Sequence, residues 1–198
     1  MQNVALIGLG VIGTPIAHRL YLSRNNHFYL VANKERKQKL LQKKIKINGD
    51  SFAPKIISDK TEIDGDVDLL IVCVKNYDLD ASLSDIQNIV TEKTVILPLQ
   101  NGIFAHHFLK KNFINNMILQ GYVQGPNTER ICDGFQYKNS GVLHIGSEKR
   151  PDIAQKIHTQ LISYDVEVVY EPDIQYMIWK KWMLNVAGNS ITALTGAV

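Results

Sequence analysis

The stretch VALIGLGVIG, Val4 to Gly13, joins a short apolar run to a glycine-rich turn and the start of a helical pattern. Its last six residues form the string G-x-G-x-x-G, which alone is weak evidence because a plain glycine turn also explains it. Here the string follows a buried strand and opens a helix, the context that dinucleotide binding requires. In that context Gly8 permits the tight turn, Gly10 lets backbone N–H groups approach a pyrophosphate, and Gly13 lets the helix pack closely on the sheet. The expected cofactor-binding residues here are Gly8, Leu9, Gly10, Val11, Ile12 and Gly13.

The rest of the first half continues this alternation of apolar runs and helical patterns. The expected strands are Val4–Gly8, His27–Ala32, Val67–Val74 and Thr94–Leu99. The expected helices are Val11–Ser23, Lys34–Lys44 and Leu79–Val90. Strands that are apolar on both faces and separated by helices are typical of a parallel sheet covered on both sides. The pattern therefore predicts an α/β fold with a Rossmann-type doubly wound parallel sheet.

Elsewhere the pattern changes to shorter, alternating strands. Lys46–Ile57 reads as an inserted hairpin around the turn dipeptide Asn48-Gly49. Met117–Ile145 reads as an antiparallel extension of the sheet. The remaining expected elements are a helix at Asp152–Ser163, a strand at Val166–Tyr170 and a long helix after Pro172.

Composition narrows the class of protein. The chain has 198 residues, of which 45% are hydrophobic and 21% charged, and its formal net charge of +3 implies neither a nucleic-acid nor a membrane partner. Cys73 and Cys132 lack metal-ligand spacing, and the His106-His107 pair has no acidic or cysteine partner at such spacing, so we expect no metal site. The start of the chain has no signal-peptide pattern, and no apolar run is long enough to span a membrane. These features indicate a cytoplasmic protein.

The cofactor is chosen by the residues that follow the second strand, about 20 residues after the glycine string. An NAD site would carry a carboxylate there for the ribose hydroxyls, whereas this chain has Asn33 and Lys34, then Glu35 and Arg36. Lys34 and Arg36 could hold a 2′-phosphate through charge-assisted hydrogen bonds, which favours NADP. The alternative is that these are only surface charges of a helix, and the side chain of Glu35 could point either way.

Two polar residues follow buried strands directly. Lys75 stands in CVKNYDLD after Val67–Val74, and Asn101 stands in LQNGI after Thr94–Leu99. Ligands bind beyond the carboxyl ends of the strands in an open parallel sheet, so both side chains should border the cofactor. A surface lysine and an ordinary Asn-Gly turn are the simpler alternatives.

A third group of polar residues lies in the apolar stretch WKKWMLNVAGN, Trp179–Asn189. Lys181, Asn185 and Asn189 are spaced four and four, so they fan over roughly 80° of one helix face, and Lys180 points elsewhere. A solvated polar stripe would explain such a pattern. Asparagine is a poor helix former, however, and in mid-helix it usually has a specific partner.

Taken together and in this order, GLGVIG, VKNYDL, LQNGI and WKKWMLNVAGN resemble the ketopantoate reductases (2-dehydropantoate 2-reductases) along the whole chain. The Lys with Asn four and eight residues later is the most specific motif. The resemblance implies NADPH-dependent reduction of a 2-oxo acid to a 2-hydroxy acid, ketopantoate to pantoate, in pantothenate and coenzyme A biosynthesis. It also implies that Lys181 is the general acid, that Asn185 and Asn189 bind substrate, and that Lys75 and Asn101 lie beside nicotinamide and substrate.

The chemistry of these residues agrees with those roles. Hydride delivery to a ketone builds negative charge on the carbonyl oxygen, and a nearby ammonium can stabilise that charge and supply the proton. On a mostly apolar helix, desolvation should lower the pKa of Lys181 toward working pH. Asparagine side chains can donate to a hydroxyl or carboxylate without adding charge.

Two features depart from the family pattern. Asn33 stands where many members have an arginine, so phosphate recognition would depend on Lys34 or Arg36. The family also has a helical second domain, and this chain stops near the start of it, on the apolar ITALTGAV. We therefore expect an NADP-binding domain at 1–171, the first helix of a truncated helical domain at 172–198, and a possible homodimer through the exposed helix.

Two other functions stay open. One is reduction of another branched or aromatic 2-oxo acid on the same fold. The other is a non-catalytic NADP-binding redox sensor, against which the combination of Lys181 with both asparagines argues, because a sensor needs no proton donor beside a carbonyl.

Overall fold

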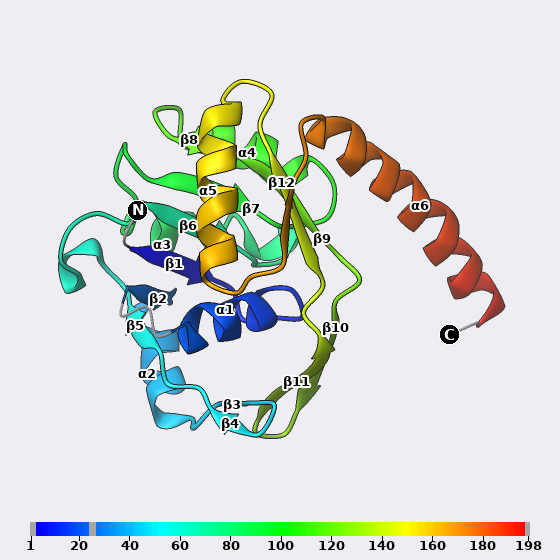
Figure 1. The fold of residues 1–198 in the computed structure, drawn as a ribbon. Coiled ribbons are helices and arrows are strands. Elements are labelled where there is room, and N and C mark those ends of the chain that lie inside the picture. Colours follow the sequence, from blue (N-terminus) through cyan, green and yellow to red (C-terminus); the bar gives the residue numbers. More distant parts are fainter. Residues whose placement is uncertain (1–2, 24–26, 197–198) are drawn as a thin grey trace.

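The computed structural model describes residues 3–23 and 27–196, and within them a six-stranded parallel sheet forms the centre (Figure 1). Its strand order is β5-β2-β1-β6-β7-β8. The bounds are β1 Val4–Ile7, β2 Phe28–Val31, β5 Lys55–Ile57, β6 Leu69–Val72, β7 Val95–Pro98 and β8 Met117–Ile118. All neighbouring pairs are parallel. The predicted Rossmann-type sheet is confirmed.

Helices cover both faces of this sheet, as the apolar strands require. Alternate residues of one strand point to opposite faces. Leu6 therefore packs with α1 (Gly13–Leu22) and α5 (Pro151–Ser163) in one core cluster. Ala5 belongs to a second cluster with α3 (Leu83–Gln87) and α4 (Phe104–Asn112). The remaining helices are α2 Lys34–Gln42, α6 Ile174–Thr195 and the short 3-10 turns η1 Lys60–Glu62 and η2 Asn76–Asp78.

The inserted hairpin is shorter than predicted. β3 (Lys46–Ile47) and β4 (Asp50–Ser51) pair antiparallel around Asn48 and Gly49, whose φ angles of 54° and 88° suit a tight hairpin turn. The prediction that Lys55–Ile57 belongs to this hairpin is wrong. Those residues form β5 and bury their isoleucines at the edge of the main sheet beside β2, because a paired parallel strand covers more apolar surface than a free hairpin arm.

The antiparallel extension starts later than predicted. Met117 and Ile118 form β8 of the main sheet, and the extension runs from β9 to β12. Its strands are β9 Gln120–Gln124, β10 Asn127–Ile131, β11 Gly134–Asn139 and β12 Val142–Gly146. β9 pairs antiparallel with β12, and β10 with β11 as a separate ribbon that joins β3. β13 (Val168–Tyr170) lies parallel to β12.

The predicted helix Leu79–Val90 is mostly wrong. Only Leu83–Gln87 is α-helical, and a turn precedes it after η2. The hydroxyl of Ser82 donates to the carbonyl of Asp78 at 2.8 Å, a side-chain bond that competes with regular helix and favours the break.

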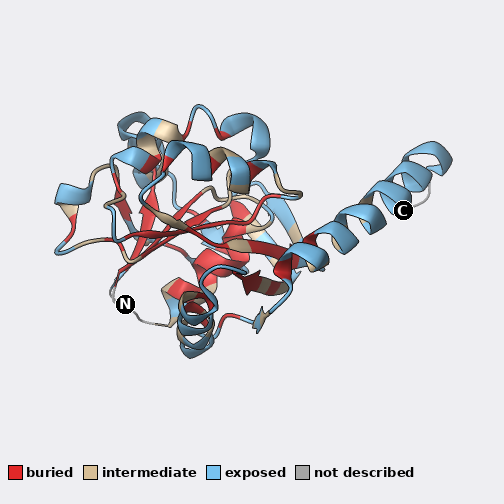
Figure 2. Ribbon diagram, turned by 90° about the horizontal axis from the view of Figure 1, so that it is seen from above, coloured by how far each residue is buried: buried red, intermediate tan, exposed pale blue. Residues whose placement is uncertain are grey.

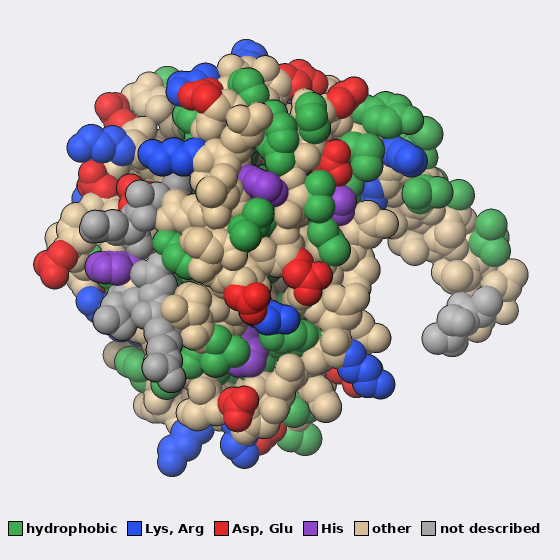
Figure 3. Space-filling view, viewed as in Figure 1, with side chains coloured by type: hydrophobic (Ala, Val, Ile, Leu, Met, Phe, Trp, Pro, Cys, Tyr) green, Lys and Arg blue, Asp and Glu red, His purple; other side chains and the backbone are tan. Residues whose placement is uncertain are grey.

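The long helix α6 leaves the body of the molecule (Figures 1 and 2). Asp173 caps it by accepting a hydrogen bond from the Tyr176 N–H at 3.2 Å. Ile174 and Ile178 are buried, whereas the helix beyond them is almost wholly exposed, and Figure 3 shows hydrophobic side chains along this arm.

No helix in the described part of the chain combines the length and apolarity needed to span a bilayer. The residues 1–2, 24–26 and 197–198 of the two predicted domains lie outside the described residues.

Candidate active site

A cleft of about 580 Å³ lies beyond the carboxyl ends of the central strands. Three segments far apart in sequence line it: the β1–α1 turn with Gly8, Leu9 and Gly10, the β2–α2 junction, and the segment after β6. The β10 strand adds a fourth wall. This is the place where ligands bind in open parallel sheets.

The glycines of the first turn meet the steric demands expected from the sequence. Gly8 has a φ of +101°, and a Cβ there would lie 2.6 Å from the backbone of Cys73 and Val74. A Cβ on Gly13 would lie 2.1 Å from the carbonyl oxygen of Gly8, so the helix could not pack so closely. Gly10 has no atom within 4 Å of such a Cβ and lines the cleft, which leaves room for a ligand to approach its backbone.

The N-terminus of α1 suits an anion. In the described residues it has neither a side-chain cap nor an acidic residue in its first turn, so its positive end is not neutralised by the protein. Val11 is exposed, Ile12 half-buried and Gly13 buried, and none of their side chains lines the cleft. A dinucleotide therefore fits this turn on steric and electrostatic grounds.

The residues after β2 separate into two groups. Arg36 lines the cleft and Lys34 lines a neighbouring pocket, whereas Asn33 lines both. Asn33 Oδ1 caps α2 by accepting the Arg36 N–H at 2.8 Å, and its amide donates to Asp85. Of the two basic residues that the sequence offered for a phosphate, only Arg36 therefore faces the cleft.

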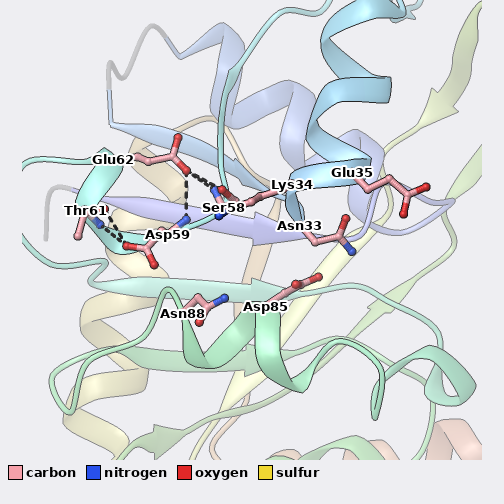
Figure 4. Close-up of a pocket in the computed structure, with 9 residues that line it drawn as sticks. All are labelled: Asn33, Lys34, Glu35, Ser58, Asp59, Thr61, Glu62, Asp85 and Asn88. Carbon is pink, nitrogen blue, oxygen red and sulfur yellow. Dashed lines mark hydrogen bonds between the residues drawn. The ribbon is translucent and has the colours of Figure 1, made fainter.

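The neighbouring pocket, of about 690 Å³, is lined mainly by polar groups that bond to one another (Figure 4). Glu62 Oε1 accepts from the Ser58 N–H at 2.7 Å, and Asp59 Oδ1 accepts from the Thr61 N–H at 2.9 Å. Although desolvation raises the pKa of Glu62, hydrogen bonds from Lys37 and Ser58 lower it to about 2. These carboxylates stabilise the η1 turn, and the pocket adjoins the cleft at Asn33 and Asp85.

Three charged residues of the cleft were missed in the sequence. Arg130 reaches it from the β10–β11 ribbon, and Asp78 and Asp85 from the segment after β6. Burial raises the pKa of Asp85. A carboxylate near the β2–α2 junction was the expected mark of NAD, and Asp85 lies at that junction although it comes from α3. No sequence pattern predicts that Arg130 lines the cleft, because its position depends on how the β10–β11 ribbon packs against the rest of the protein.

Lys181 lies on α6 beside the loop after β7 and is not among the residues that line the cleft, so its role as proton donor stays a prediction. Its ammonium donates to the carbonyl of Val123 at 2.7 Å and to Asn101 Oδ1 at 3.2 Å, and it lies 5.0 Å from the centre of the Tyr122 ring. Desolvation by burial lowers the pKa of Lys181, as predicted. α6 and the loop after β7 are thereby joined at one point.

The other predicted site residues differ in where they lie relative to the cleft and to Lys181. Lys75 lines the cleft, and its pKa is raised by a hydrogen bond with Tyr77. Asn101 does not line the cleft, but its carbonyl accepts a 3.5 Å hydrogen bond from Asn76, next to Lys75. Asn185 is half-buried and Asn189 exposed, one and two turns beyond Lys181 on the projecting part of α6. Their role in substrate binding stays a prediction.

Residues 4–149 match the family model of ketopantoate reductases PanE/ApbA. The chain belongs to this family. It is 28% identical to the 2-dehydropantoate 2-reductase of Bacillus subtilis (strain 168) over 198 residues, which cover 98% of this chain and 64% of the relative. The chain thus spans about 64% of the length of that relative.

Two solved structures share the fold. A dimeric ketopantoate reductase from Staphylococcus aureus is 23% identical, with a TM-score of 0.73 over 97% of this chain and 63% of its own. A D-mandelate dehydrogenase in a ternary structure with NADH and anilino(oxo)acetate is 22% identical, with a TM-score of 0.72 over 92% of this chain and 61% of its own. This member of the ketopantoate reductase family therefore shares its Rossmann-type fold with both solved structures.

Proposed function

We propose that this protein reduces a 2-oxo acid to the 2-hydroxy acid with NADPH, and that ketopantoate is its substrate. The observation that carries the proposal is the environment of Lys181. An ammonium has three N–H donors. Val123 and Asn101 accept two of them in the described structure, so one is left for a substrate oxygen.

In this reaction the protein holds a proton ready at the Nζ of Lys181. Burial lowers the pKa of Lys181, so its ammonium releases a proton more readily than an exposed lysine does. The amide oxygen of Asn101 and the Val123 carbonyl orient that ammonium. The positive charge stabilises negative charge on the carbonyl oxygen, which then takes the proton. A bound nicotinamide dinucleotide would supply the hydride.

The cleft between β1, β2 and β6 would hold the dinucleotide. The turn Gly8–Gly13 and the free end of α1 would bind its pyrophosphate. Arg36 would bind the 2′-phosphate of NADPH, with Asn33 and Lys75 as further lining groups. Lys34 is a less favoured candidate for this phosphate contact, because it lines the neighbouring pocket.

The remaining roles follow the family resemblance. Asn185 and Asn189 would bind the substrate, with Asn101 beside it. We propose that residues 1–171 form the NADP-binding domain and that α6, within 172–198, begins a helical domain that completes the site. The exposed apolar side of α6 and the dimeric state of the Staphylococcus aureus enzyme make a homodimer the expected assembly.

An aromatic 2-oxo acid is the second candidate substrate. The D-mandelate dehydrogenase of similar fold was solved with an oxoacetate that carries an anilino group. In this chain the exposed rings of Trp179 and Trp182 lie 5.5 Å apart on α6, on sides of the helix other than that of Lys181. The aromatic alternative is therefore supported by that dehydrogenase and not by the two tryptophans.

A substrate panel distinguishes these functions. In a protein that includes the proposed helical domain, NADPH consumption is followed with ketopantoate, with 2-oxoisovalerate and with benzoylformate, and the 2-hydroxy acid is identified by mass spectrometry. We expect the largest kcat/KM with ketopantoate. A preference for benzoylformate would assign the aromatic alternative. Binding of NADPH without turnover of any oxo acid would contradict the reductase and favour the sensor.

A further inference from the structure

Tyr122 and His144 form a stacked pair beside Lys181. They lie opposite one another in the antiparallel register of β9 and β12, so their side chains share one face of the sheet. Their ring centres are 4.6 Å apart and their planes differ by only 3°. Cross-strand neighbours on one face are expected to touch, but near-parallel rings at this distance require both side chains to be held.

Each ring has its own support. His144 Nδ1 donates to Glu171 Oε1 at 2.8 Å, with the two side chains 12% and 18% exposed. A carboxylate only accepts, so this bond places the proton of that ring nitrogen and orients the imidazole. Tyr122 packs in a core cluster with Ile174 and Ile178 of α6. The tyrosine ring is therefore held from the sheet side and from the helix side.

Lys181 meets this ring from the helix. It lies three residues after Ile178 and seven after Ile174, so the three side chains share one helix face. Its Nζ stands 5.0 Å from the centre of the Tyr122 ring. The negative face of an aromatic ring attracts an ammonium, more strongly where water is excluded.

The other surroundings of Lys181 make this contact important. In the described structure its ammonium donates to the neutral Val123 carbonyl and to the Asn101 amide oxygen, and no Asp or Glu of the described residues forms an ion pair with it. A carboxylate at that place would hold the ammonium proton tightly. An aromatic face favours the cation less strongly, so it can fix the ammonium while the proton stays transferable.

We infer that Tyr122, clamped by His144 and Glu171, is a positioning residue for the Lys181 ammonium. It acts through Lys181 and makes no contact with the reacting atoms. The consequence for turnover rests on the proposed reductase function, whereas the effect on the ammonium itself does not.

The test compares Tyr122→Phe, which keeps the ring, with Tyr122→Leu, which removes it. Trace acetylation of the lysines over a range of pH, read by tandem mass spectrometry, reports the pKa and the reactivity of Lys181. Lys180, exposed on the same helix, serves as the internal reference. We expect Tyr122→Phe to match the wild type. In Tyr122→Leu the acetylation of Lys181 at neutral pH should rise about three- to thirtyfold, the range that loss of a cation–π contact implies.

Turnover adds a second readout. In Tyr122→Leu kcat should fall with little change in KM, and Tyr122→Phe should restore it. If the wild type reduces no oxo acid, the proposed function fails while the acetylation result still decides the inference. If Tyr122→Leu does not fold, His144→Val, which frees the ring from its stack, should raise the acetylation of Lys181 in the same direction. Identical acetylation profiles for Lys181 in the wild type and in the folded variants would overturn the inference.

Discussion

At the scale of single residues, Lys181 holds a charge in surroundings that disfavour it. Burial lowers its pKa in the folded protein below the usual value of a lysine, which the unfolded chain keeps. Between the two pKa values the unfolded chain binds more protons than the folded one, so the free energy of unfolding rises with pH across that window. Replacing Lys181 removes this dependence.

We therefore expect Lys181→Met to flatten the dependence of stability on pH. The gain in unfolding free energy relative to the wild type should be largest at the low-pH end and shrink as the pH approaches about 10.5. Urea titrations from neutral to alkaline pH measure it. Lys180→Met, at an exposed position, is the control and should keep the slope of the wild type. A slope unchanged in Lys181→Met would show that its pKa is not lowered.

Variants of Arg36 and Lys34 can distinguish a specific contact with the 2′-phosphate from a general effect of surface charge on binding. Arg36→Gln should weaken NADPH binding about ten- to a hundredfold, as expected for the loss of a charged hydrogen bond, and leave NADH binding nearly unchanged. Lys34→Gln removes the same charge from the neighbouring pocket and should have a much smaller effect. Fluorescence titration with both dinucleotides checks this. Equal losses for NADPH and NADH would contradict a phosphate contact at Arg36.

At the scale of elements, the sequence predicted best the strands that are buried on both faces. Four central strands lie within the predicted ranges: β1, β2, β6 and β7. A continuous apolar run is buried on both faces only at the centre of a covered sheet, so its position is strongly determined by the sequence. The short edge strands β5 and β8 were assigned to the wrong units. Two or three residues carry too little periodicity to reveal their partner, and tertiary packing decides it.

The β10–β11 ribbon brings Arg130 to the cleft, and this supplies a test at the scale of an element. A cation facing a dinucleotide should attract its phosphates, so Arg130→Gln should weaken dinucleotide binding by about threefold or more. Lys138→Gln, on the exposed side of the same ribbon, is the matched control because Lys138 does not line the cleft. Calorimetric titration with NADPH measures both. If both variants bind alike, Arg130 does not face the cofactor.

At the scale of the whole molecule, local patterns in the sequence pointed to single candidate residues but not to the other charged residues that line the cleft. The turn at Gly8, the lysine after β6 and Lys181 were each found from a local pattern. The contact of Lys181 with Asn101 joins residues 80 positions apart and could be expected only from the family resemblance. Asp85, Arg130 and the Tyr122–His144 stack carry no local signal, because their roles depend on how distant strands and helices meet.

The proposed function depends on Lys181 as the proton donor in the reduction of an oxo acid. The most direct measurement is the rate of ketopantoate reduction with NADPH by Lys181→Ala, beside Lys180→Ala and the wild type. We predict that Lys181→Ala lowers kcat by about 10²–10⁴-fold, the usual contribution of a general acid, and that Lys180→Ala keeps the rate of the wild type. NADPH binding, measured on the same samples, should stay the same in all three proteins. A Lys181→Ala variant that binds NADPH and turns over as fast as the wild type would contradict the account.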